Sequence, residues 1–83
     1  MKLETIQDLI KQELVNEGIV EEITFTEFHG RKAIKIEDII ISLPMSLINE
    51  CQSAFDHETR MLAVKDTATQ IFKAYNQTLS RRT

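Results

Sequence analysis

The sequence contains few of the residues that usually interrupt or cross-link a small fold. Its 83 residues include two glycines, one proline, one cysteine and no tryptophan. The single cysteine, Cys51, excludes an internal disulfide, and no cysteine cluster has the spacing of a structural zinc site. With only Gly18 and Gly30, the chain also lacks the glycine-rich loop that cradles a phosphate.

Long hydrophobic runs are missing as well. No stretch approaches the roughly 18 apolar residues of a membrane-spanning helix. Residues 1–4 are amphipathic, unlike the continuous apolar stretch of a signal peptide. We therefore expect a soluble protein without a membrane partner, and the single thiol favours the reducing cytoplasm. The length predicts one small domain, 1–83, with a loose basic tail at 81–83.

Basic residues are few in the first part of the chain, and acidic residues are few in the last part. The formal net charge is −3. Residues 1–58 hold twelve acidic and five basic residues, a balance of −7, whereas residues 59–83 hold five basic residues and one acidic residue, a balance of +4. The negative sum predicts no general affinity for nucleic acid. The basic C-terminal part is typical of a helix end, where the helix dipole favours cations.

Two local patterns predict a helix followed by a β-hairpin. Apolar residues recur every three or four positions over residues 3–17, and Gly18 predicts a left-handed residue that closes this helix, with Ile19 packing back on Leu14. From Ile23 the period changes to two, as in a strand. His29-Gly30 then predicts a tight turn, because Gly30 tolerates the positive φ that such a turn needs.

The returning strand changes parity at Glu37-Asp38. Ile34 and Ile36 are even-numbered, whereas the following apolar positions are odd: Ile39, Ile41 and Leu43. A strand of period two changes face only through an extra residue or a reversal. We favour a bulge in one of two long strands, because Glu-Asp lacks the glycine or asparagine of a good turn. A second turn, which makes a three-stranded meander, is the alternative.

Pro44 ends the strands and suits the first position of a helix. Residues 45–83 contain no glycine or proline, and the following residues keep helical spacing: Leu47, Ile48, Cys51, Ala54, Phe55, Met61, Leu62, Ala68, Ile71, Phe72, Tyr75 and Leu79. One helix over 45–80 would be ~54 Å long, too long for so small a domain. Either it breaks near 56–59 or its distal half packs against another chain. The fold class is therefore α+β: helix, antiparallel hairpin, long C-terminal helix.

The residues that could carry catalysis are poorly placed for it. Cys51 and His57 lie about 120° apart on a helix, which excludes a nucleophile–base pair. The metal-ligand candidates, Glu27 with His29 and the run 56–58, do not converge. Adjacent carboxylates are typical of a solvated face. We expect no enzyme activity, no catalytic or metal-binding residue and no cofactor.

Two groups of residues remain of interest as interaction surfaces. One is the hairpin tip, where an aromatic residue lies beside two cations: Phe28, His29, Arg31 and Lys32. The other is the basic, partly aromatic distal helix: Arg60, Lys65, Lys73, Tyr75, Arg81 and Arg82. The ordinary interpretations are a solvated turn and a helix C-terminus that carries the cations its dipole prefers.

The leading hypothesis is a small non-catalytic protein–protein interaction module. A two-stranded hairpin is marginal in water, so its apolar surface favours self-association, with a symmetric dimer first, or binding of another protein. Compact acidic chains of this kind are common among phage and mobile-element accessory proteins, including inhibitors. The alternative is a DNA- or RNA-associated regulator that uses the hairpin tip and the basic C-terminal helix. The element order resembles that of a family of bacterial nucleoid-associated proteins and of small phage head-completion proteins, a similarity of order alone.

Overall fold

The chain begins with helix α1, Leu3–Asn16, in a computed structural model that describes residues 2–82. The predicted closure of this helix is confirmed. Gly18 adopts a φ of 109°, and the Ile19 N–H donates to the Leu14 carbonyl at 3.2 Å while the Gly18 N–H donates to the Val15 carbonyl at 3.0 Å. These two bonds form a Schellman motif. Ile19 and Leu14 both lie in the core.

The predicted hairpin is also confirmed. Strands β1, Ile23–Phe28, and β2, Arg31–Ile36, pair antiparallel with Phe28 opposite Arg31. His29 and Gly30 form the two-residue connection and both have positive φ, 53° and 76°. A positive φ at both positions is the mark of the type I′ turn, whose twist matches that of the strands.

The sheet has three strands, so the preference for a bulge was wrong and the meander is confirmed. Strand β3, Ile39–Ser42, pairs antiparallel with β2, giving the order β1-β2-β3. The turn at Glu37-Asp38 forms without glycine because Glu37 accepts a φ of 56°. That conformation costs an ordinary residue about 1–2 kcal/mol. The turn places Ile39 opposite Ile36 on the same face, and burying an isoleucine contributes about 1.5–3 kcal/mol.

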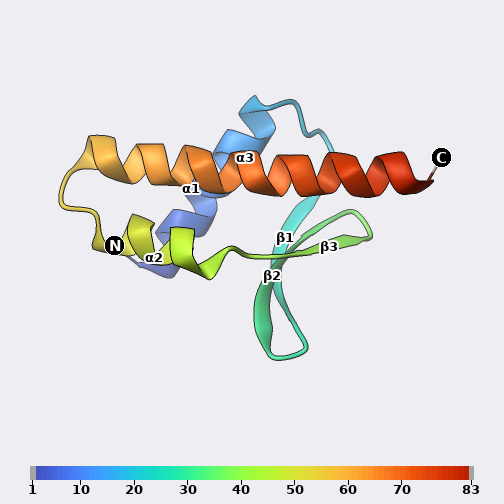
Figure 1. Cartoon of the computed structure of the whole chain (residues 1–83), viewed down its shortest axis with the longest axis horizontal. Coiled ribbons are helices and arrows are strands. Elements are labelled where there is room, and N and C mark those ends of the chain that lie inside the picture. Colours follow the sequence, from blue (N-terminus) through green and yellow to red (C-terminus); the bar gives the residue numbers. More distant parts are fainter. Residues whose placement is uncertain (1, 83) are drawn as a thin grey trace.

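The C-terminal half consists of two helices, so the alternative with a break near 56–59 is the one present, with the connection slightly earlier, at 54–56. Helix α2, Met45–Ser53, starts one residue later than expected, with Pro44 as its N-cap. Helix α3, His57–Arg82, runs along the long axis of the molecule (Figure 1). Between them Ala54 is extended, and the chain reverses so that α2 packs beside the first half of α3 (Figure 1). The overall extents are 42 × 28 × 18 Å.

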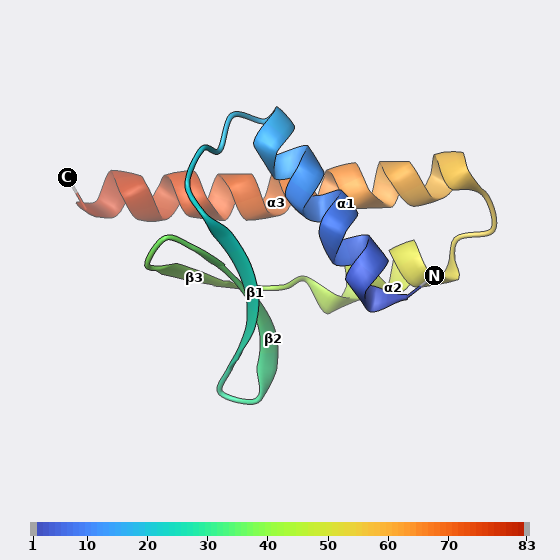
Figure 2. The same ribbon diagram turned by 180° about the vertical axis from the view of Figure 1, so that it is seen from behind.

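Helices cover one face of the sheet, and the other face is largely exposed except at Ala33, which is buried. The covered face contributes Ile23, Ile34, Ile36 and Ile39 to the core, where they meet the apolar stripes of α1 and α3. Thr24 and Lys35, which point the other way, are exposed. The tip of the β1–β2 hairpin extends away from the helices in both views (Figures 1 and 2).

Candidate functional site

The connection between α2 and α3 is held by a helix cap. The Asp56 carboxylate accepts a hydrogen bond from the Thr59 backbone N–H at 2.7 Å, and the Asp56 carbonyl accepts one from the Arg60 N–H at 3.1 Å. Asp56 is therefore the N-cap of α3. Its hydrogen bond from Thr59 holds the pKa of the Asp56 carboxyl below its usual range. The stability that this cap contributes is present above the pKa that the Asp56 carboxyl has in the unfolded chain. It is lost as pH falls through the lower pKa of the folded state.

Arg60 fixes the same connection from the other side. Its Nε donates to the Cys51 carbonyl at 3.2 Å and its guanidinium donates to the Ala54 carbonyl at 2.9 Å. The last carbonyls of a helix have no partner within that helix. The first turn of α3 thus supplies donors for the end of α2, and the backbone of residues 54–56 is held in place.

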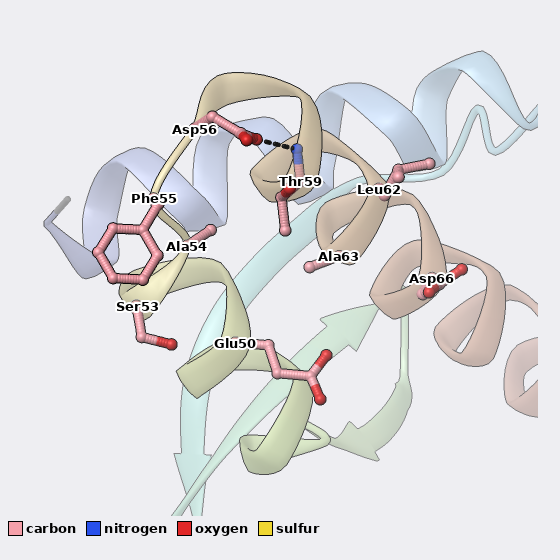
Figure 3. Close-up of a pocket in the computed structure, with 9 residues that line it drawn as sticks. All are labelled: Glu50, Ser53, Ala54, Phe55, Asp56, Thr59, Leu62, Ala63 and Asp66. Carbon is pink, nitrogen blue, oxygen red and sulfur yellow. Dashed lines mark hydrogen bonds between the residues drawn. The ribbon is translucent and has the colours of Figure 1, made fainter.

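This connection leaves Phe55 outside the fold. The Phe55 side chain is fully exposed, at 104% of its reference area, and Leu62 of α3 is 60% exposed. Both line a hollow of about 480 Å³ at the turn between the two helices (Figure 3). We call its lining the corner surface: Glu50, Ser53, Ala54, Phe55, Asp56, Thr59, Leu62, Ala63 and Asp66.

The charged residues of the corner surface are all acidic. Glu50, Asp56 and Asp66 are its charged residues, and no lysine, arginine or histidine is among the residues that line it. Figure 3 shows Glu50 and Asp66 on different helices. Its two large apolar side chains, Phe55 and Leu62, lie on opposite sides of the hollow (Figure 3).

All four hairpin-tip residues lie at the far end of β1 and β2, where Arg31 and Lys32, as successive residues of one strand, point to opposite faces. The Phe28 and His29 rings meet edge to face, with centroids 4.2 Å apart. Arg31 and Lys32 line a second hollow of about 500 Å³, which Met45 also borders. The predicted tip surface therefore consists of two groupings, the Phe28–His29 ring pair and the hollow lined by Arg31 and Lys32, and its use as an interaction surface stays a prediction.

The six residues predicted on the distal helix are not one surface. Tyr75 is 5% exposed and lies in the core. The Arg60 guanidinium group donates its hydrogen bonds to backbone carbonyls. Lys65 and Lys73 are exposed. Arg81 and Arg82, expected in a loose tail, form the last turn of α3, and Thr83 lies outside the described residues. The Arg82 guanidinium pairs with Asp38 at 3.1 Å and holds the pKa of that carboxyl below its usual range.

Sequence reasoning missed the corner surface because it placed Phe55 and Leu62 in one series of helically spaced apolar residues. Phe55 lies instead in the connection between α2 and α3, and both side chains are exposed. The signal that would have found them is Asp56, a favoured N-cap three residues before Thr59. If a helix starts after Asp56, Phe55 falls in the connection and leaves the helical pattern.

Cys51 behaves as a core residue. Its side chain is fully buried, and burial raises the pKa of the thiol, which disfavours the reactive thiolate. Among the described residues, no three side chains of histidine, cysteine, aspartate or glutamate are grouped closely enough to hold a metal ion. Within residues 2–82, no helix has both the length and the apolar character needed to cross a membrane.

Comparison with known proteins found no match among protein-family models, curated proteins or solved structures. The expected phage or mobile-element origin therefore stays a prediction. The function proposed below is therefore inferred from the geometry of this chain alone.

Proposed function

We propose that the chain is a non-catalytic protein-binding module and that the corner surface docks a segment of its partner. The observation that carries the proposal is the fully exposed Phe55 ring. A large aromatic side chain in water leaves unused about 1.5–3 kcal/mol of burial free energy. Aromatic residues that fill a partner's pocket are the usual centres of binding energy.

The rigidity of the connection supports this function. Asp56 caps α3 and Arg60 bonds to the end of α2, so the backbone on both sides of Phe55 is held before any partner binds. A preformed anchor loses little conformational entropy on binding. Leu62, on the other side of the hollow, provides further exposed apolar area.

The carboxylates define the partner's chemistry. Glu50, Asp56 and Asp66 favour a partner segment that combines apolar side chains with lysine or arginine. A second copy of the chain is a poor occupant, because it would bring the same three carboxylates to the contact. A hollow of about 480 Å³ accommodates a few side chains, which suits a helix or short segment rather than a broad flat surface.

Peptide selection tests the proposal directly. The full chain is immobilised and used to select peptides from a random displayed library, and the selected peptides are then measured by fluorescence anisotropy. We expect selected sequences rich in lysine, arginine and apolar residues. Phe55→Ser should weaken their binding about thirtyfold, the effect of losing a hot-spot residue. Its melting temperature should stay unchanged, because the ring has no packing in the free protein.

Phe28→Ser provides the matched control. Phe28 is the other strongly exposed phenylalanine, at 49%, and it lies at the hairpin tip. The proposal expects this variant to bind as the unmodified chain does. Loss of binding in Phe28→Ser with full binding in Phe55→Ser would contradict the proposal and would transfer the function to the hairpin tip.

A further inference from the structure

The sheet has an open edge along β1. Strand β2 lies on one side of β1, and no strand of the described part of the chain lies on the other. The Glu37 N–H donates to the Glu22 carbonyl at 3.1 Å. In an antiparallel pair such bonds recur at every second residue. The even-numbered residues of β1 therefore bond to β2, and the N–H and C=O groups of Ile23, Phe25 and Glu27 point toward the open edge.

This edge has little of the usual protection against pairing. Exposed edges are commonly blocked by proline, charged side chains (lysine above all), a bulge or a very short strand, and β1 carries one charged residue, Glu27. Strand β1 has six residues, contains neither proline nor lysine, and pairs with β2 in an unbroken register. Its distal half belongs to the hairpin that extends clear of the helices (Figure 2). A second strand can therefore approach it.

We propose that a second copy of the chain pairs antiparallel along β1, with Phe25 opposite Phe25, to form a six-stranded sheet across a two-fold axis. About this axis the sequence Thr24-Phe25-Thr26 reads the same in both directions, so like residues meet across the contact. A two-fold contact must be self-complementary, and this register places Thr24 of each copy opposite Thr26 of the other. The two half-buried Phe25 rings meet on the face that carries the core.

The acidic residues near β1 are compatible with this register. Glu27 of one copy lies opposite Ile23 of the other, so no carboxylate directly faces another carboxylate within the strand. Glu21 and Glu22 precede the strand and add negative charge at both ends of the contact. Screening by salt should therefore strengthen the dimer, opposite to the weakening expected for binding at the acidic corner surface.

Sedimentation equilibrium of the full chain across the micromolar range, with Glu27→Pro, tests the proposal. The Glu27 N–H points to the open edge, so proline removes a donor that the fold does not use. We expect the unmodified chain to dimerise and Glu27→Pro to remain a folded monomer by circular dichroism. Glu27→Gln, the matched control, keeps the N–H and should dimerise at least as well. A monomeric unmodified chain, or a Glu27→Pro variant that still dimerises, overturns the proposal.

Amide hydrogen exchange keeps the test decisive if Glu27→Pro does not fold. In the unmodified chain, exchange at Ile23, Phe25 and Glu27 should slow as protein concentration rises, because these N–H groups become bonded only in the dimer. Exchange that does not change with concentration overturns the pairing. Neither negative result would contradict the proposed function of the corner surface, since peptide binding there does not require a dimer.

Discussion

Tyr75 shows how a residue expected on a surface contributes instead to the core. Its ring is 5% exposed, and burial raises the pKa of the phenol, with the carboxylates of Glu21 and Glu37 acting in the same direction. The folded state therefore favours the neutral phenol. The unfolded chain ionises at the ordinary pKa near 10, so stability is present below that pH and falls as pH rises above it.

Tyr75→Phe should reduce this alkaline loss of stability. The substitution keeps the ring that packs in the core and removes the group that ionises. We expect nearly equal stability of both proteins near neutral pH and a smaller decrease for the variant as pH rises above about 10. Urea unfolding across this range measures it. Because the pKa of Cys51 is also raised, both proteins should still lose some stability as pH rises. An identical decrease of stability with pH in the two proteins would contradict the prediction.

At the scale of elements, the α2–α3 pair depends on contacts that cross from one helix to the other. Arg60 lies in the first turn of α3 and donates to carbonyls at the end of α2. Without those donors, two partly buried carbonyls lose their partners. Together with the Asp56 cap, Arg60 therefore holds Phe55 in position at the corner surface.

Arg60→Ala should destabilise the protein by about 1–3 kcal/mol, the range for losing hydrogen bonds from a charged donor. Denaturant unfolding measures the loss of free energy. Lys65→Ala, which removes an exposed cation on the same helix, should stay within about 0.5 kcal/mol of the unmodified chain. If the two variants were equally stable, the carbonyl bonds of Arg60 would have no role in holding the connection.

At the scale of the whole molecule, the cations are dispersed. Arg60 bonds to backbone carbonyls, Arg82 pairs with Asp38, and the two cations of the hairpin tip lie on another element. Phosphate binding needs several free cations along one surface. This arrangement favours the protein-binding function over the nucleic-acid alternative.

We therefore expect no retention of the chain on duplex DNA at about 50 mM salt, where phosphate contacts are strongest. An electrophoretic mobility assay with the full chain measures this. Binding that weakens with salt and weakens further in an Arg81→Ala/Arg82→Ala double variant would support the nucleic-acid alternative instead. The double variant should otherwise fold normally, because both side chains are exposed.

What the sequence determined by itself was local. The end of α1 at Gly18 and the turn at His29-Gly30 follow from the φ values that glycine permits, and both are present. The location of the hairpin-tip residues at one end of the sheet was predictable for the same reason, since a tight turn keeps its flanking residues next to it. None of these features needs a distant part of the chain.

Only the tertiary structure decided the second turn and the corner surface. Glu37 accepts an unfavourable φ because the turn allows Ile39 to join the core beside Ile36, a gain that no local pattern reveals. Phe55 keeps the same helical spacing from its neighbours whether one helix or two are formed. It is the packing of α2 against α3, held by Asp56 and Arg60, that places its ring in water.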